Sequence, residues 1–198
     1  MLHVDLTAKK IEAKALNPEW LKDYIGGWGL AVRYFYDLSN PESDALSSET
    51  PIVIMTGPLC GTLAPTSSRL CLVSKSPATG TILESNVGGA FGPELKFAGY
   101  DGIIITGQSD HPVYLRIEDD QVTLENADPI WGKGIFETEE WLQQTMGNGA
   151  KSLSIGPAGE NIIPFACIGS EAYRQMGRGG TGALFGAKKL KAIACSDR

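Results

Sequence analysis

The chain has 198 residues, 42% of them hydrophobic, which fits one domain or two small ones and is long enough to bury a substantial core. Its net charge of -6 and the absence of a basic stripe argue against a nucleic-acid partner. The sequence contains neither a run of about 18 apolar residues nor a signal peptide, so no membrane partner and a cytoplasmic location are expected. Four scattered cysteines argue against a cysteine-ligated zinc or iron–sulfur site in this chain.

Alternation of apolar and polar residues and short apolar runs predict strands along the first half, over residues 2–6, 11–16, 51–56, 69–75 and 102–105. The first two of these strands form a hairpin. Asn17 and Pro18 predict the start of a helix, with asparagine as the N-cap and proline in the first turn. Glycines at 26, 27 and 29 interrupt it before a second helix over 30–38.

In the second half, the same patterns predict strands over residues 112–117, 122–125, 151–155 and 192–194. A helix is predicted over 138–146, with Thr138 as its N-cap and Glu139 and Glu140 in its first turn. Gly156-Pro157 is expected to lead into an extended segment.

The two halves share an order of short motifs: Gly-Pro, Gly-Gly, Phe-Gly, Leu-Lys and then a strand. In the first half these motifs are Gly57-Pro58, Gly88-Gly89, Phe91-Gly92 and Leu95-Lys96. In the second half they are Gly156-Pro157, Gly179-Gly180, Phe185-Gly186 and Leu190-Lys191. The shared order favours duplication over chance matches among common residues. The predicted fold class is α+β, with mixed or antiparallel sheets and an internal duplication about a pseudo-twofold axis.

Each Gly-Gly turn is predicted to lead into a helix, whose unpaired N–H groups and dipole favour an anion. Arg69 and Asn86 belong to the first turn, and Arg174 and Arg178 to the second. Because arginine matches phosphate geometry, the pattern predicts two phosphate-bearing ligands, or one ligand with two phosphates. The alternative is that the glycines only let helix and sheet pack closely. The sequence contains no P-loop, no Rossmann fingerprint, no nucleophile elbow and no zinc-protease motif. We therefore expect this chain to bind a ligand rather than to catalyse a reaction.

Five segments resemble the aldehyde ferredoxin oxidoreductase family, in order and in register along essentially the whole chain. They are GPLCGTLAPTSSR at 57–69, SNVGGAFGPELKFAGYD at 85–101, IGPAGEN at 155–161, GRGGTG at 177–182 and LKAIA at 190–194. The resemblance implies that residues 1–198 form the N-terminal, pterin-binding domain of such an enzyme, whose later domains lie outside this chain.

The resemblance also implies the cofactors. They are a bis-molybdopterin (pyranopterin) with tungsten or molybdenum, a magnesium ion bridging the pterin phosphates, and a four-iron four-sulfur cluster held by other domains. The cofactor-binding residues at matching positions are Arg69, Asn86, Gly88, Gly89, Arg174, Gln175, Gly177, Arg178 and Gly179. Asn86 and Gln175 match the positions that offer backbone carbonyls to magnesium. No catalytic residue is expected in this chain.

The implied activity is oxidation of an aldehyde to a carboxylic acid, with electrons passing through the cluster to ferredoxin. The implied partners are the remaining domains or subunit of the enzyme, ferredoxin and a small-molecule aldehyde, with a homodimer left open. The isolated chain is expected to be inactive. Two alternatives are a non-catalytic module that stores or delivers the pterin cofactor, and a purely structural or interaction role.

Overall fold

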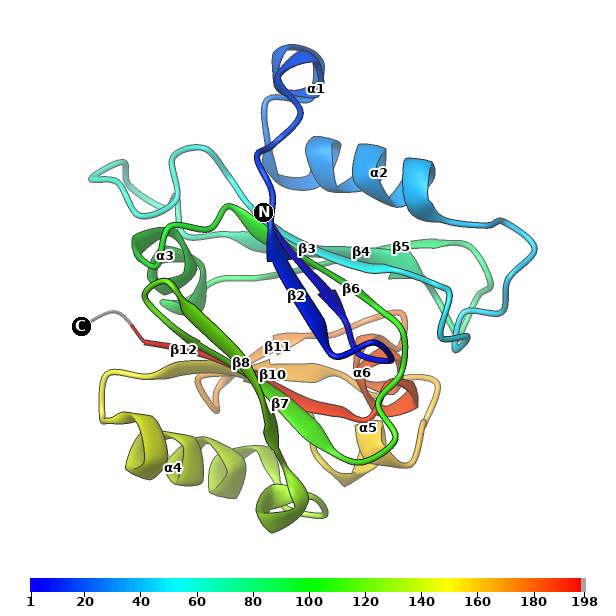
Figure 1. Ribbon diagram of the computed structural model, residues 1–198, viewed down its shortest axis with the longest axis vertical. Coiled ribbons are helices and arrows are strands. Elements are labelled where there is room, and N and C mark those ends of the chain that lie inside the picture. The colour runs from blue at the N-terminus through cyan, green and yellow to red at the C-terminus, as the bar shows by residue number, and fades with distance from the viewer. Residues whose placement is uncertain (197–198) are drawn as a thin grey trace.

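The computed structural model describes residues 1–196, and Figure 1 shows two sheets stacked between helices. In the first sheet, called sheet A, the strands lie in the order β2 (Lys10–Ala13), β1 (Leu2–Asp5), β6 (Gly102–Thr106), β3 (Ile52–Thr56), β4 (Leu70–Lys75) and β5 (Ile82–Val87). In the second, called sheet B, they lie in the order β8 (Gln121–Asn126), β7 (Val113–Glu118), β12 (Leu190–Ser196), β9 (Lys151–Ser154), β10 (Ile168–Ser170) and β11 (Arg174–Met176).

Helices connect these strands. They are α1 (Pro18–Tyr24), α2 (Gly27–Leu38), α3 (Phe91–Phe97), the 3-10 turn η1 (Asp128–Ile130), α4 (Ile135–Met146), α5 (Pro157–Glu160) and α6 (Thr181–Ala187). In the part of the chain that the structure describes, no helix has the length and apolar character needed to cross a membrane.

The two sheets have the same topology. Each strand of sheet A corresponds to the strand of sheet B whose number is six higher, and the order across the sheet is identical. In both sheets one pair of neighbours is parallel, β1 with β6 and β7 with β12, and the others are antiparallel. The predicted α+β class with mixed sheets and an internal duplication is confirmed. The duplication also includes the hairpins β1–β2 and β7–β8, which the motif order did not cover.

The duplicated motifs are only partly equivalent in space. Phe91-Gly92 opens α3, whereas Phe185-Gly186 lies near the end of α6. Leu95-Lys96 lies within α3, whereas Leu190-Lys191 opens β12. These two motif matches were therefore wrong as structural equivalences, although the duplication itself is present.

The strand register gives the equivalences that matter for the site. Leu70 opens β4 and pairs with Val87, the last residue of β5. Ile168 opens β10 and pairs with Met176, the last residue of β11. It follows that the residues before these strand ends, Asn86 and Gln175, are equivalent, and so are the residues after them, Gly88 and Gly177.

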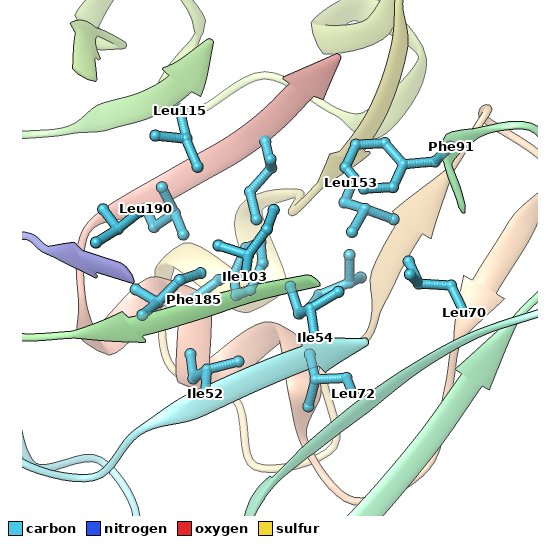
Figure 2. Close-up of a cluster of buried hydrophobic side chains, with 14 of the residues drawn as sticks. Ile52, Ile54, Leu70, Leu72, Phe91, Ile103, Leu115, Leu153, Phe185 and Leu190 are labelled. Atoms are coloured by element: carbon cyan, nitrogen blue, oxygen red, sulfur yellow. The ribbon is translucent and has the colours of Figure 1, made fainter. Parts of the chain in front are cut away.

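A single apolar core fills the space between the two sheets. Figure 2 shows side chains from strands of both sheets, among them Ile54, Leu72, Leu115 and Leu153, gathered in this space. A second cluster joins α2 to the outer face of sheet A, and a third joins α4 to the outer face of sheet B. The layers are therefore helix, sheet, sheet, helix, as Figure 1 shows.

This layering explains the apolar runs in the sequence. In β3, Ile52 and Ile54 point into the shared core, whereas Val53 and Met55 point toward α2. Because successive residues of a strand face opposite sides, a strand covered on both faces is apolar throughout. All five residues of β3 are buried.

One helix start agrees with the prediction and two differ from it. The cap of α1 is as predicted, since Asn17 Oδ1 accepts from the N–H groups of Glu19 (2.9 Å) and Trp20 (3.3 Å). Helix α2, however, begins at Gly27, so the glycine segment forms its first turn instead of preceding it.

Helix α4 begins at Ile135 and not at Thr138, which lies inside the helix and is buried. The Glu137 carboxylate accepts from the Gly134 N–H at 2.9 Å and caps the helix from within its first turn. After Gly156, Pro157 opens the short helix α5 where an extended segment was predicted. Proline suits this position because its missing N–H would be unpaired in the first turn anyway.

Candidate cofactor-binding site

The fold brings the two predicted half-sites together. Strands β5 and β11 are edge strands of their own sheets, and they lie against each other. Asn86 is the next-to-last residue of β5 and Gln175 the next-to-last residue of β11. Each Gly-Gly turn lies against the other half, the first beside Glu171 and Arg174 and the second beside Leu83. Cδ of Arg174 lies 3.2 Å from the position a Cβ would take at Gly89.

The first half-site opens into a hollow of about 480 Å³ on the α2 side of sheet A. Arg69, an exposed side chain just before β4, lines it together with Asn86 and Trp28. The remaining lining residues are Gly27, Gly57, Pro58, Leu59, Pro65, Thr66, Ser67 and Cys71. The sequence prediction that Arg69 and Asn86 belong to one site agrees with this geometry.

Two polar side chains that line this hollow, those of Asn86 and Cys71, are described by their partners and charge state. Asn86 Nδ2 donates to Glu84 Oε1 at 2.7 Å, which fixes the amide beside the hollow. Cys71 pairs with Asn86 across β4 and β5. Burial, with a smaller contribution from the Glu84 charge, raises the pKa of the Cys71 thiol to about 12. The thiol is therefore neutral at physiological pH.

The glycines of the two turns fall into two classes. Gly88 and Gly177 have φ outside the left-handed region, and no heavy atom of residues 1–196 lies within 4 Å of the position of an added Cβ, apart from their chain neighbours. Neither backbone conformation nor packing within the described chain requires glycine at these two equivalent positions. Their open sides leave room for another molecule to approach the main chain.

Gly89 and Gly179 belong to the second class, because the protein itself fills the space beside them. Their φ values are +118° and +94°. An added Cβ would lie 2.5 Å from Glu171 Oε1 at Gly89, and 2.2 Å from Leu83 Cδ1 at Gly179. Glycine is required there by the backbone and by packing.

Close packing also accounts for the glycines that follow. An added Cβ at Gly182 would lie 2.5 Å from Cys167 O, and one at Gly186 would lie 1.9 Å from Gly159 O. Helix α6 thus lies so close to α5 at Gly186, and to the segment before β10 at Gly182, that neither position has room for a side chain. For this part of the second glycine cluster, the packing alternative was the correct one.

Three N–H groups at the starts of α3 and α6 already have protein acceptors, whereas the prediction expected them to be unpaired. Ala90 N–H and Phe91 N–H both donate to Glu171 Oε1, the second at 3.2 Å. Gly182 N–H donates to Ala166 O at 2.9 Å. Since protein acceptors occupy these three groups, an anion bound here would depend mainly on the arginines.

All three predicted arginines are exposed, and two of them have no acidic partner within residues 1–196. Arg69, Arg174 and Arg178 are exposed. Within the described residues, no acidic group lies within 4.0 Å of Arg69 or Arg178. Arg174 Nη1 lies 3.5 Å from Glu171 Oε2. Gln175 accepts from Cys167 Sγ through Oε1 at 2.9 Å, so its side chain is held by a neighbour.

Sequence reasoning missed Glu171 and Ser76. Glu171 lies in the connection between β10 and β11, and Ser76 in the connection between β4 and β5. Each contacts the glycine turn of the opposite half, Glu171 through Ala90 and Ser76 Oγ through Gly179 O at 2.8 Å. The only signal in the sequence was the placement of Glu171 three residues before Arg174.

Comparison with known proteins identifies the family of this chain. The family described as aldehyde ferredoxin oxidoreductase, N-terminal domain, matches residues 1–197. The chain belongs to this family.

Two relatives with different named activities match nearly all of the chain. The chain is 45% identical over 194 residues to the tungsten-containing aldehyde ferredoxin oxidoreductase of Pyrococcus abyssi, which covers 98% of this chain and 32% of the relative. It is 35% identical over 209 residues to the WOR-like subunit of the aliphatic sulfonate oxidoreductase of Pyrococcus furiosus, with 98% and 33% covered.

A solved structure shares the fold. It is a chain of the active site complex BamBC of benzoyl coenzyme A reductase in complex with 1,5-dienoyl-CoA, with a TM-score of 0.96 and 38% sequence identity. The match covers 98% of this chain and 30% of that chain. The chain therefore spans about a third of the length of the relatives it matches.

Proposed function

We propose that this chain is the base on which a bis-pyranopterin cofactor with tungsten or molybdenum is bound in a larger oxidoreductase. The observation that carries the proposal is the pair Gly88 and Gly177. They occupy equivalent positions in the two halves, and no contact or backbone conformation within residues 1–196 accounts for glycine at either. A ligand with two similar parts, each approaching one main-chain segment, accounts for both.

The charged groups fit such a ligand. Although the chain carries a net charge of -6, Arg69 and Arg178 are exposed and lack ion-pair partners in the described residues. Arginine binds phosphate through two parallel hydrogen bonds. Arg69 would serve the first pterin, and Arg174 and Arg178 the second.

The other contacts come from the main chain. The segments at Gly88-Gly89 and at Gly177 and Gly179 would lie along the two pterins. The backbone carbonyls of Asn86 and Gln175 would bind a magnesium ion between the two phosphates. Oxygen ligands suit magnesium, and a carbonyl ligand makes the side chain at 175 unimportant for this role.

The proposed activity is oxidation of an aldehyde to a carboxylic acid, in keeping with the name of the Pyrococcus abyssi relative. When bound, the cofactor supplies the two-electron redox chemistry, while the protein supplies binding, orientation and exclusion of water. The proposed partners are the remaining domains or a further subunit with a four-iron four-sulfur cluster, and ferredoxin as electron acceptor. No residue of this chain is assigned a catalytic role, and the chain alone is proposed to be inactive.

The test compares three glycine variants of the complete enzyme: Gly88→Ala, Gly177→Ala and the control Gly149→Ala. Gly149 also has open space at its Cβ position and φ outside the left-handed region, but it lies in the loop before β9. Metal analysis and the fluorescence of oxidised pterin should show lower cofactor content in the first two variants only, with unchanged thermal stability. Equal cofactor content in all three variants would contradict the glycine argument.

Measurements on the wild-type enzyme distinguish the proposed oxidoreductase domain from the alternative, a module that stores or delivers the pterin cofactor. Bis-pterin together with tungsten or molybdenum, and aldehyde-dependent dye reduction, are the expected results. Pterin binding without any aldehyde-dependent activity in the assembled protein would favour a module that stores or delivers the cofactor. Absence of pterin and of both metals would reject the proposed function.

A further inference from the structure

We propose that Glu171 is a positioning residue that couples the two cofactor half-sites, an inference that rests on the proposed function. Its Oε1 atom accepts from the N–H groups of Ala90 and Phe91, directly after the first glycine turn. Its Oε2 atom lies 3.5 Å from Nη1 of Arg174 in the second half-site. One carboxylate thus contacts both half-sites, one oxygen to each.

The surroundings of Glu171 are built for this contact. Its side chain is 19% exposed, compared with 53% for Arg174, so the carboxylate is largely enclosed while its arginine partner faces solvent. At Gly89, an added Cβ would lie 2.5 Å from Glu171 Oε1. The first turn therefore needs glycine at 89 partly to admit this carboxylate.

The backbone that carries Glu171 is strained. Glu171 and Ala172 have φ of 50° and 59°, in the left-handed region that residues with a Cβ seldom adopt. Consecutive strained residues persist only where the surrounding structure holds them, and such strain is concentrated at functional sites. Here the strained connection between β10 and β11 carries the carboxylate to the turn of the other half.

The contact has a counterpart in the opposite direction. In the connection between β4 and β5, Ser76 Oγ donates to Gly179 O at 2.8 Å. At Gly180, an added Cβ would lie 2.6 Å from Pro77 Cγ. Each half thus supports the glycine turn of the other. Only Glu171 brings a charge and also contacts an arginine of its own half-site, so the coupling is assigned to Glu171 and not to Ser76.

The experiment uses the complete enzyme with Glu171→Ala, Glu171→Gln, Ser76→Ala and the control Glu140→Ala, an exposed glutamate on α4. Glu171→Gln keeps an acceptor for the two N–H groups but removes the charge that faces Arg174. Because it preserves the size of the side chain, it still tests the proposal if Glu171→Ala fails to fold. The two measurements are the rate of pterin release and hydrogen exchange of peptides covering residues 88–97 and 174–181.

In Glu171→Ala we expect exchange to increase in both peptides and pterin release to become roughly tenfold faster, as the loss of a charge-assisted hydrogen bond implies. Glu171→Gln should lie between Glu171→Ala and wild type. Ser76→Ala should increase exchange at 174–181 only, and Glu140→Ala should resemble wild type.

Two results would overturn the coupling. One is increased exchange at 88–97 alone, and the other is a rate of pterin release equal to that of wild type despite increased exchange. If wild-type enzyme holds no pterin, the proposed function fails, and the exchange pattern in the two peptides still decides whether Glu171 couples the turns.

Discussion

Lys191 Nζ lies 2.5 Å from Oε1 of Glu160, and both side chains are buried, with exposed fractions of 0% and 5%. Lys191 also donates to Lys133 O at 2.8 Å and to Ile155 O at 2.7 Å. Both oxygens of Glu160 accept from the Gly132 N–H, at 3.0 and 2.9 Å. The ion pair joins β12 to α5, with most of its hydrogen-bonding capacity satisfied.

Removing one partner of this pair should be strongly destabilising. In Glu160→Gln or Lys191→Met, a buried charge or polar group loses its partner, and we expect a loss of about 3–5 kcal/mol in the free energy of unfolding. The double variant should lose less than the sum of the two. Urea denaturation measures this, with Glu140→Gln as an exposed control. Single variants as stable as this control would show that the pair contributes little.

Lys188 should make stability depend on pH. This lysine is 2% exposed, and its Nζ donates to Ser48 O and Gly107 O at 3.0 Å each. Burial lowers the pKa of Lys188 from 10.5 to about 8, while the Asp5 charge opposes the change. Between these values the unfolded chain binds more protons than the folded one, so stability rises with pH in this range.

The Lys188→Met variant isolates this contribution. The free energy of unfolding of wild type, relative to that of the variant, should rise by about 2 kcal/mol between pH 7.5 and 9.5. This figure takes about 1.4 kcal/mol for each unit by which the pKa differs between the folded and unfolded chain. Urea denaturation of both proteins at the two pH values measures the difference. A difference that stays constant, or that falls as pH rises, would contradict the lowered pKa.

The packing glycines should respond differently from the open ones. Gly186→Ala would place a Cβ 1.9 Å from Gly159 O, a backbone atom that cannot move without shifting α5. We expect a loss of about 3 kcal/mol in the free energy of unfolding. Gly88→Ala should change stability by less than about 1 kcal/mol, since its added Cβ meets nothing. Similar melting temperatures for the two variants would remove the distinction between the glycine classes.

The arginines should affect cofactor retention and leave folding unchanged. Arg69→Ala and Arg178→Ala each remove charged hydrogen bonds worth about 1.5 to 3 kcal/mol to a phosphate-bearing ligand, roughly a tenfold or larger loss of affinity. Because both side chains are exposed and unpaired within residues 1–196, thermal stability of the cofactor-free protein should stay within a few degrees of wild type. Lys22→Ala on α1 serves as the control, and pterin content in both arginine variants equal to that control would argue against the assignment.

Local signals predicted much of the fold. Asn17 and Pro18 fixed the start of α1, and the apolar alternation located β3 and β4 to within one residue. The start of α4 was wrong because Thr138 resembles a cap, whereas the true cap involves Gly134 and the Glu137 side chain. A threonine in a helix interior and one at an N-cap are distinguished by burial, which a single sequence does not reveal.

The site could be predicted only in outline. Arg69 and Asn86 were assigned to one half-site from a shared pattern, and they line one hollow. The availability of the N–H groups at α3 was predicted wrongly because their acceptor, Glu171, is 81 residues from Ala90 in the chain. Such a contact depends on the packing of one sheet on the other, which local propensity does not encode.

Each half supports the glycine turn of the other half through a connection between two of its strands, and this mutual support has a further consequence. A half-length chain could obtain the same support for its glycine turn only from a second copy of itself, as a homodimer. Joining the halves through the segment between β6 and β7 makes that association intramolecular, so it no longer depends on concentration. It also allows the two turns to differ, and in this chain one is supported by a carboxylate and the other by a hydroxyl.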